Sequence, residues 1–208
     1  VDSDSLYAGA MAITWEEHLS PRGSFAVQFD GTAGGISHSQ FGALRVKDAI
    51  VDRYRARCGE RPTVDRATPD VRVQAYLHQD QVTLSLDLSG DSLHLRGYRR
   101  LGSAAPLKEN LAAAILLRAS WPELAAAGAA LLDPLCGSGT LCIEGALIAA
   151  DIAPGLGHRH WGLTGWRGHE AASWEALLAE ARERRRAGLA RLAAEGGSIR
   201  GYDWDPAA

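Results

Sequence analysis

The residues best suited to chemistry lie in the stretch LLDPLCGSGTLCIEG, residues 131–145. An apolar run ends in Asp133, Gly137 and Gly139 follow, and the residues after them have the composition of a helix. Glycine lets the backbone approach a ligand closely and adopt positive φ. A strand, a glycine turn and a helix N-terminus in this order are typical of sites that hold nucleotide-like ligands.

The details of this turn separate two classes of cofactor. A dinucleotide site requires G-x-G-x-x-G, but Cys142 stands where the third glycine would be, and no P-loop G-K-[ST] follows. Asp133 would repel a pyrophosphate, whereas it can accept hydrogen bonds from a cationic aminoacyl group. S-adenosylmethionine carries a sulfonium and an ammonium group and no phosphate, so the pattern predicts this cofactor. The alternative is a tight strand-to-helix turn without a ligand.

A second acid is expected where the next strand of such a domain ends. The segment GYDWDP places Asp203 there, where its carboxylate would bind the ribose hydroxyls, and Trp204 could pack against the adenine. The separation from Asp133 exceeds the roughly 20 residues of a compact nucleotide-binding unit. This interpretation therefore requires an insertion between Asp151 and Gly197. Without an insertion, Asp203 is merely an acid in a turn.

Several segments together resemble a known family. LHLRGYR, APLKENLAAAIL, LLDPLCGSGTLCIEGALIA, APGL and GYDWDP occur in the order seen in THUMP-domain RNA guanine-N2 methyltransferases. VKDAIVD, VDRATPDVRV, LDLSGDSLHLRGYR and WGLTGW are similar to the bacterial members that act on the 23S ribosomal RNA of the large subunit. The resemblance runs nearly end to end and is far more specific than a glycine turn alone.

The resemblance implies an α/β protein in which a THUMP module grips folded RNA and precedes a Rossmann-like, class I methyltransferase domain. The full-length enzyme would methylate the N2 amine of a guanine in 23S ribosomal RNA, with S-adenosylmethionine as the cofactor, in the cytoplasm. Carried over by position, the cofactor loop comprises Asp133, Cys136, Gly137, Gly139 and Thr140, and Asp203 is the ribose-binding acid. Lys108, Glu109 and Asn110 match the segment that closes over the methionine end, as candidates of second rank.

One departure from the family pattern concerns the chemistry itself. The family's catalytic loop, an Asn or Asp followed by Pro-Pro and an aromatic residue, comes downstream of the ribose acid, and this sequence contains no such segment. Such a loop would position the guanine amine for in-line attack on the sulfonium methyl. We therefore expect a fragment of a longer enzyme, inactive alone, and assign no catalytic residue. The alternative is a non-catalytic RNA-binding module with a vestigial methyltransferase half; a DNA amino-methyltransferase would not explain the first hundred residues.

Apolar spacing predicts the elements that position these residues. We expect a THUMP-like domain over 1–98, a linker over 99–105 and the N-terminal part of a methyltransferase domain over 106–208. The first domain would contain a strand at 24–29, a helix at 39–57, a hairpin of strands at 71–77 and 82–88, and a short strand at 93–95. The second would contain a helix at 106–121 with an apolar stripe of Leu107, Leu111, Ala114 and Ile115, a strand ending at Asp133, a helix at 140–151, a helix capped by Ser173, and a strand at 198–203.

Basic residues give two segments a potential for RNA contact. The candidates are Arg45, Lys47 and Arg53 on the expected helix at 39–57, and Arg96 and Arg99 beside the linker. Phosphate contacts would make RNA affinity fall with salt. Asp48 and Asp52 interrupt the first run, so a solvated helix face is an equal alternative, as is ordinary surface charge for the second pair.

The bulk composition excludes several classes. The chain has 208 residues, 46% of them hydrophobic, and a formal net charge of −3, which gives no support to RNA binding by bulk charge. Its three cysteines show no C-x-x-C spacing, which argues against a disulfide framework or a zinc site and favours a reducing compartment. The histidines of HRHW have no neighbouring acid or cysteine at ligand spacing, so no metal is expected. No apolar run approaches the roughly 18 residues that span a bilayer.

Overall fold

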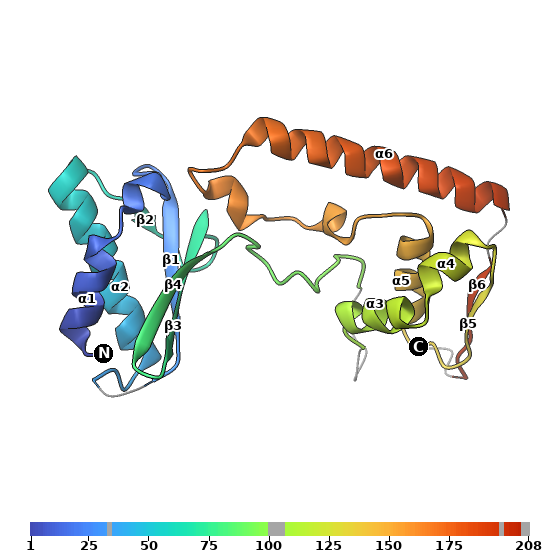
Figure 1. Ribbon diagram of the computed structural model, residues 1–208, viewed down its shortest axis with the longest axis horizontal. Helices are drawn as coiled ribbons and strands as arrows, with labels where there is room; N and C mark the ends of the chain where they lie inside the picture. Colours follow the sequence, from blue (N-terminus) through green and yellow to red (C-terminus); the bar gives the residue numbers. More distant parts are fainter. Residues whose placement is uncertain (33–34, 100–106, 196–197, 205–208) are drawn as a thin grey trace. The chain divides into compact units, whose positions relative to one another are not determined.

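The structure, a computed structural model, describes residues 1–32, 35–99, 107–195 and 198–204 (Figure 1). The predicted linker at 99–105 therefore falls almost entirely outside the described residues. The chain divides into two compact units, the first made of Val1–Asp91 with His160–Ala171 and the second of Ser92–Arg159 with Ala172–Ala208. Each unit contains its own core.

Unit 1 is built on a four-stranded mixed sheet with the order β2-β1-β3-β4. Its strands are β1 (Ser24–Asp30), β2 (Thr63–Val64), β3 (Val71–His78) and β4 (Gln81–Asp87). β1 runs parallel to β2 and β3, while β3 and β4 form an antiparallel hairpin. Gln79 and Asp80 make the turn with φ of 45° and 63°, as the tightest hairpin turns require. The predicted strand and hairpin are confirmed, whereas the two-residue strand β2 was not among the predicted elements.

Two helices cover one face of this sheet, α1 (Ser3–Ala12) and α2 (Ser39–Cys58), with the short 3₁₀ turn η1 (Trp15–Glu17) after α1 (Figure 1). The helix predicted at 39–57 is confirmed, and its Val46, Ile50 and Tyr54 are completely buried. α1 was not among the predicted elements, because its first residues are mostly polar. Asp2 and Ser5 instead form a capping box, with Ser5 N donating to Asp2 Oδ1 at 2.8 Å.

Unit 2 contains a parallel pair of short strands, β5 (Leu131–Asp133) and β6 (Ile199–Gly201), in which Asp133 is paired with Gly201. Its helices are α3 (Glu109–Arg118), α4 (Trp121–Ala126), α5 (Thr140–Ala149) and α6 (Ala171–Glu195), whose first residue belongs to unit 1. The 3₁₀ turn η2 (Pro154–Gly157) follows α5, and η3 (Gly162–Gly165), farther along the same connection, belongs to unit 1. The strands and the helix predicted around the glycine turn are confirmed.

The helix predicted at 106–121 differs from the structure in extent and in its buried face. Ser120 adopts φ 55° and separates α3 from α4. Leu111 and Ile115, expected in the core, are 51% and 45% exposed, whereas their neighbours Ala112 and Leu116 are buried. A run of alanine and leucine offers two apolar stripes one residue apart, and tertiary packing selects between them.

Two smaller predictions were also wrong. Residues 93–95 form a turn rather than a strand, and Leu93 and Leu95 are about half exposed. Ser173 lies inside α6 and does not cap it, because the helix begins two residues earlier at Ala171. Within the part of the chain that the structure describes, no helix combines the length and the apolar character needed to cross a bilayer.

Candidate functional site

The glycine turn connects β5 to α5 through backbone conformations that glycine adopts more readily than other residues. Gly137 and Gly139 have φ of 50° and 76°, in the left-handed region. Asp133 ends β5, and its Oδ1 accepts a hydrogen bond from Leu135 N at 3.1 Å. A Cβ built on either glycine would meet no atom within 4 Å. The turn is therefore backbone that faces open space at the end of a strand.

Asp203 reaches the same turn from the neighbouring strand. Its Oδ2 accepts a hydrogen bond from Gly137 N at 2.8 Å. The backbone continues the pairing beyond the strands, since Cys136 N donates to Tyr202 O at 2.9 Å and Tyr202 N donates to Asp133 O at 2.8 Å. The structure thus brings both predicted acids to the carboxyl ends of two parallel strands, the edge at which open α/β sheets bind ligands.

Gly201 is a part of this arrangement that sequence reasoning missed. A Cβ at Gly201 would lie 2.8 Å from Cys136 Sγ and 3.0 Å from Cys142 Sγ. The two cysteines therefore pack the turn and α5 against the bare backbone of β6. Burial, with a contribution from the Asp133 carboxylate, raises the pKa of the Cys142 thiol, which keeps it protonated and apolar in character. The signal for this role is a glycine inside a strand.

The three candidate residues at the start of α3 differ in their exposure to solvent. Lys108 and Asn110 are exposed, whereas Glu109 is 3% exposed and accepts a hydrogen bond from Arg99 Nε at 3.0 Å. Burial raises the pKa of Glu109, but hydrogen bonds from its own backbone N–H and from Arg99 outweigh burial and lower it. Glu109 is thus an ionised internal partner of Arg99, whereas the side chains of Lys108 and Asn110 lie at the surface.

A second buried carboxylate anchors the segment before the linker to α5. Glu144 is 2% exposed and accepts a hydrogen bond from the Tyr98 hydroxyl at 2.9 Å. Burial and this hydrogen bond raise the pKa of Tyr98. Arg96 Nε lies 3.5 Å from Glu144 Oε1. Arg96 and Arg99 therefore have carboxylate partners inside unit 2, and this geometry gives no support to their predicted role in RNA contact.

The basic residues of α2 fall into two groups. Arg53 is 12% exposed and donates to both carboxylate oxygens of Glu16 at 2.9 Å, so it ties α2 to η1 rather than facing RNA. Arg45 pairs with the exposed Asp4 at 3.2 Å and lies over the ring of Tyr7. Lys47 pairs with its neighbour Asp48 and lines a groove.

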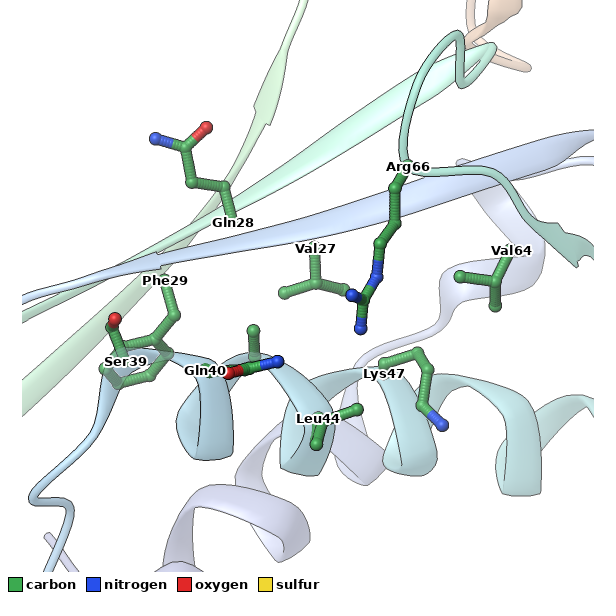
Figure 2. Close-up of a pocket in the computed structure, with 10 residues that line it drawn as sticks. Val27, Gln28, Phe29, Ser39, Gln40, Leu44, Lys47, Val64 and Arg66 are labelled. Atoms are coloured by element: carbon green, nitrogen blue, oxygen red, sulfur yellow. The ribbon is translucent and has the colours of Figure 1, made fainter.

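That groove, of about 340 Å³, lies between β1 and α2 (Figure 2). Val27, Phe29 and Leu44 supply apolar side chains, while Lys47 and Arg66 supply positive charge. Figure 2 shows the Arg66 side chain extending from the segment after β2 toward the space above α2. Sequence reasoning missed Arg66, because it stands alone in a segment rich in proline and acid.

The described residues contain no cluster of three or more His, Cys, Asp or Glu side chains able to hold a metal ion.

Comparison with known proteins gives two family matches. Residues 96–208 match the description "RMKL-like, methyltransferase domain", and residues 1–87 match the THUMP domain. Among curated proteins, the chain is 59% identical over 203 residues to the ribosomal RNA large subunit methyltransferase K/L of Allochromatium vinosum and 57% identical over 206 residues to that of Stutzerimonas stutzeri. These matches cover 98% and 99% of the chain, but only 27% and 28% of the relatives.

Two solved structures share the fold over nearly the whole chain. One is from Listeria monocytogenes and is described as "a predicted N6-adenine-specific DNA methylase", with a TM-score of 0.74, 28% identity and coverage of 98% of this chain and 57% of that chain. The other is SMU.472, described as "a putative methyltransferase complexed with SAH", with a TM-score of 0.75, 26% identity and coverage of 97% of this chain and 58% of that chain.

Proposed function

Because this chain belongs to the family of RMKL-like methyltransferase domains, we propose that the longer protein containing it transfers a methyl group from S-adenosylmethionine to 23S ribosomal RNA. The acceptor would be the N2 amine of a guanine. The chain spans little more than a quarter of the ribosomal RNA methyltransferases it matches. It would contribute the RNA-binding unit and the cofactor turn, and no catalytic residue is assigned within it.

The single observation that carries this proposal is the convergence of Asp133, the glycine turn and Asp203 at one strand edge. Gly137 N lies 2.8 Å from the Asp203 carboxylate, and the space beside both turn glycines is open. An edge that presents two carboxylates suits a ligand with positive charge and hydroxyl groups better than a pyrophosphate. The two carboxylates and the open backbone of the turn therefore fit S-adenosylmethionine. SMU.472, a structural relative, is described in complex with SAH.

Each residue of the site would have a distinct role. The Asp133 carboxylate would accept hydrogen bonds from the ammonium group, and Asp203 would accept them from the ribose hydroxyls. Gly137 and Gly139 would leave room for the ligand against the backbone, while Cys136 and Thr140 fix the ends of the turn. Lys108 and Asn110 are exposed at the start of α3 and would close over the methionine end. The cofactor supplies an electrophilic methyl group; these residues only hold and orient it.

RNA contact is assigned to the groove between β1 and α2. Lys47 and Arg66 would bind phosphates, with Arg45 on the same helix as a further contact. The apolar residues of the groove could receive part of a base or ribose. Phosphate contacts position an RNA without reading its sequence, so selection of the target guanine would require other parts of the full-length protein.

The test uses the full-length protein, methyl-labelled S-adenosylmethionine and 23S ribosomal RNA from cells that lack the modification. Nucleoside mass analysis should find N2-methylguanosine, with 16S ribosomal RNA and DNA as acceptors that stay unlabelled. Label in adenine of DNA would replace the proposed acceptor with the one named for the Listeria protein. RNA binding without any transfer would leave a non-catalytic RNA-binding protein.

A further inference from the structure

One edge of β1 is paired over only part of its length. β2 pairs with β1 at Ser24 and Phe25, through Thr63 and Val64. Asp65 N then donates to Phe25 O at 3.0 Å, and the pairing ends there. Beyond Phe25, no strand of the described residues pairs with this edge of β1.

The unpaired part of the edge presents backbone donors and acceptors. In a strand, the N–H and C=O groups of alternate residues point to the same edge. Phe25 is bonded to β2 on this side, so the N–H and C=O of Val27 and Phe29 point there too. On this edge, neither residue has a hydrogen-bond partner among the described residues. Such an edge is a template for a further hydrogen-bonding partner.

The groove between β1 and α2 lies against this edge. Val27, Gln28 and Phe29 all line it, although side chains of consecutive strand residues alternate between the two faces. Figure 2 shows the Gln28 side chain on the opposite side of β1 from those of Val27 and Phe29. Gln28 therefore borders the groove through its backbone, and the open edge of β1 forms part of the groove wall.

The rest of the groove indicates the chemistry of its occupant. Lys47 and Arg66 supply positive charge, and the described residues that line the groove include no acid. Ser39 and Gln40 add polar groups, and Leu44 adds an apolar side chain. The volume of about 340 Å³ is at the lower end of small-ligand pockets. One nucleotide combines the matching features, a phosphate and a flat base whose edge carries donors and acceptors.

We propose that this groove holds an unpaired RNA nucleotide whose base forms hydrogen bonds with the backbone of Val27 and Phe29, an inference that rests on the proposed function. Lys47 and Arg66 would bind the flanking phosphates, and Leu44 would pack against the base. In a duplex the Watson–Crick edges are already paired, whereas a loop, bulge or strand end exposes them. Unit 1 would therefore select single-stranded segments of the RNA.

The experiment measures the affinity of the full-length protein for two probes, a short single-stranded RNA of mixed sequence and the same RNA annealed to its complement. Val27→Pro removes one donor from the open edge and leaves the pairing with β3, and edge strands tolerate proline. This variant should bind the single strand about 10-fold more weakly, the scale of one or two hydrogen bonds, and the duplex unchanged. Gln28→Ala, whose side chain lies on the other side of β1, is the matched control and should bind both probes as wild type does.

If Val27→Pro does not fold, Ala43→Leu makes the same distinction, because it adds bulk to the groove from α2 without altering β1. Equal weakening of both probes, or of neither, would overturn the inference, while methyl transfer to 23S ribosomal RNA would leave the proposed function intact. Self-association that Val27→Pro abolishes, with RNA binding unchanged, would assign the edge to a second copy of the chain and overturn the inference as well. Wild-type protein that neither binds RNA nor methylates it would overturn the proposed function together with the inference.

Discussion

Asp133 and Asp203 approach one turn from adjacent strands, yet their carboxylates are engaged differently. Asp133 accepts a local hydrogen bond from Leu135 N, which orients it at the strand end. Asp203 accepts a hydrogen bond from Gly137 N, 66 residues away in the chain. Asp203 therefore holds the turn in shape in addition to any contact with a ribose, and its substitution should affect both stability and ligand binding.

Substitution of Gly201 tests how closely the turn packs on β6. In Gly201→Ala, the new Cβ would lie 2.8 Å from Cys136 Sγ and 2.9 Å from Cys136 Cβ, so the turn must move. Overpacking of this kind costs about 1–3 kcal/mol. We expect a lower urea midpoint and weaker S-adenosylmethionine binding. Gly9→Ala, where a Cβ meets nothing within 4 Å, is the control. Equal urea midpoints and equal S-adenosylmethionine affinities in the two variants would show that the packing around Gly201 is loose.

Tyr54 gives unit 1 a predictable dependence on alkaline pH. Its hydroxyl donates to the carbonyl oxygens of Leu19 and Trp15 at 2.5 and 3.1 Å, and burial raises the pKa of Tyr54 to about 12, with Glu16 adding to the effect. The unfolded phenol deprotonates near its ordinary pKa of about 10, so the free energy of unfolding falls as pH rises from 10 toward 12.

Tyr54→Phe isolates this contribution. Below pH 10 the variant should be less stable by about 1–2 kcal/mol, because two buried carbonyl groups lose a donor. Above pH 10 the difference from wild type should shrink, since only the wild-type phenol titrates. Urea unfolding at pH 9 and pH 11 measures both differences. A difference that stays constant between these values would contradict the raised pKa.

At the residue scale, sequence located the glycine turn and the acid that precedes it, but it did not indicate which basic side chains are paired inside a unit. Asp133 and the turn glycines were predictable because the order of apolar run, glycines and helical segment is a local sequence pattern. The fate of Arg53 and Arg99 depends on Glu16 and Glu109, whose burial arises from tertiary packing. Charge along a sequence does not distinguish an arginine paired inside a unit from an exposed one such as Arg66.

Among the elements, the short segment His160–Ala171 stands apart because it belongs to unit 1 although unit 2 flanks it in sequence. Leu163 N donates to Leu88 O at 2.9 Å, and Arg167 N donates to His18 O at 3.0 Å. A Cβ on Gly162 would lie 2.2 Å from Asp87 O. The WGLTGW segment is therefore a fixed part of the unit that carries the sheet.

Gly162→Ala should separate this segment from the end of β4. The backbone must retreat from Asp87 O, so the hydrogen bond from Leu163 N to Leu88 O should weaken or break. Hydrogen exchange of the Leu163 amide should accelerate, while exchange in the centre of β3 stays unchanged. Unaltered protection of Leu163 would show that the segment does not depend on this close approach.

At the element scale, the strands and helices with one strong period were predictable, and those with two possible faces were not. α2 has a single apolar stripe that ends at Tyr54, and both its extent and its face are confirmed. α3 offers Leu111 and Ile115 on one face and Ala112 and Leu116 on the next, and the second is buried. Such offsets of one residue are decided by the partner surface, which no local pattern contains.

For the molecule as a whole, the chain crosses between the two units three times, at residues 91–92, 159–160 and 171–172. The second and third crossings arise because His160–Ala171 belongs to unit 1. Family resemblance predicted the two-part organisation, but the sequence did not indicate that His160–Ala171 would belong to unit 1. The functional consequence is that the unit proposed to bind RNA and the unit proposed to bind cofactor are tied together at several points in the chain.

RNA binding by the full-length protein should depend on the groove of unit 1. Lys47→Ala and Arg66→Ala should each lower affinity for 23S ribosomal RNA and reduce the slope of log affinity against log salt by about 0.7–0.9, the value for one phosphate contact. Arg61→Ala, an exposed arginine absent from the residues that line the groove, is the control. Salt slopes unchanged in all three variants would place the RNA on another surface.

The most direct test of the central claim, that the glycine turn after β5 holds S-adenosylmethionine, is equilibrium binding of the cofactor to the full-length protein and to its Asp133→Asn variant. The structure predicts saturable binding by wild type and an affinity at least about 10-fold lower in the variant, because a charge-assisted hydrogen bond is lost. Circular dichroism should show that the variant is folded. Equal affinity in the two proteins would contradict the claim and place the cofactor elsewhere.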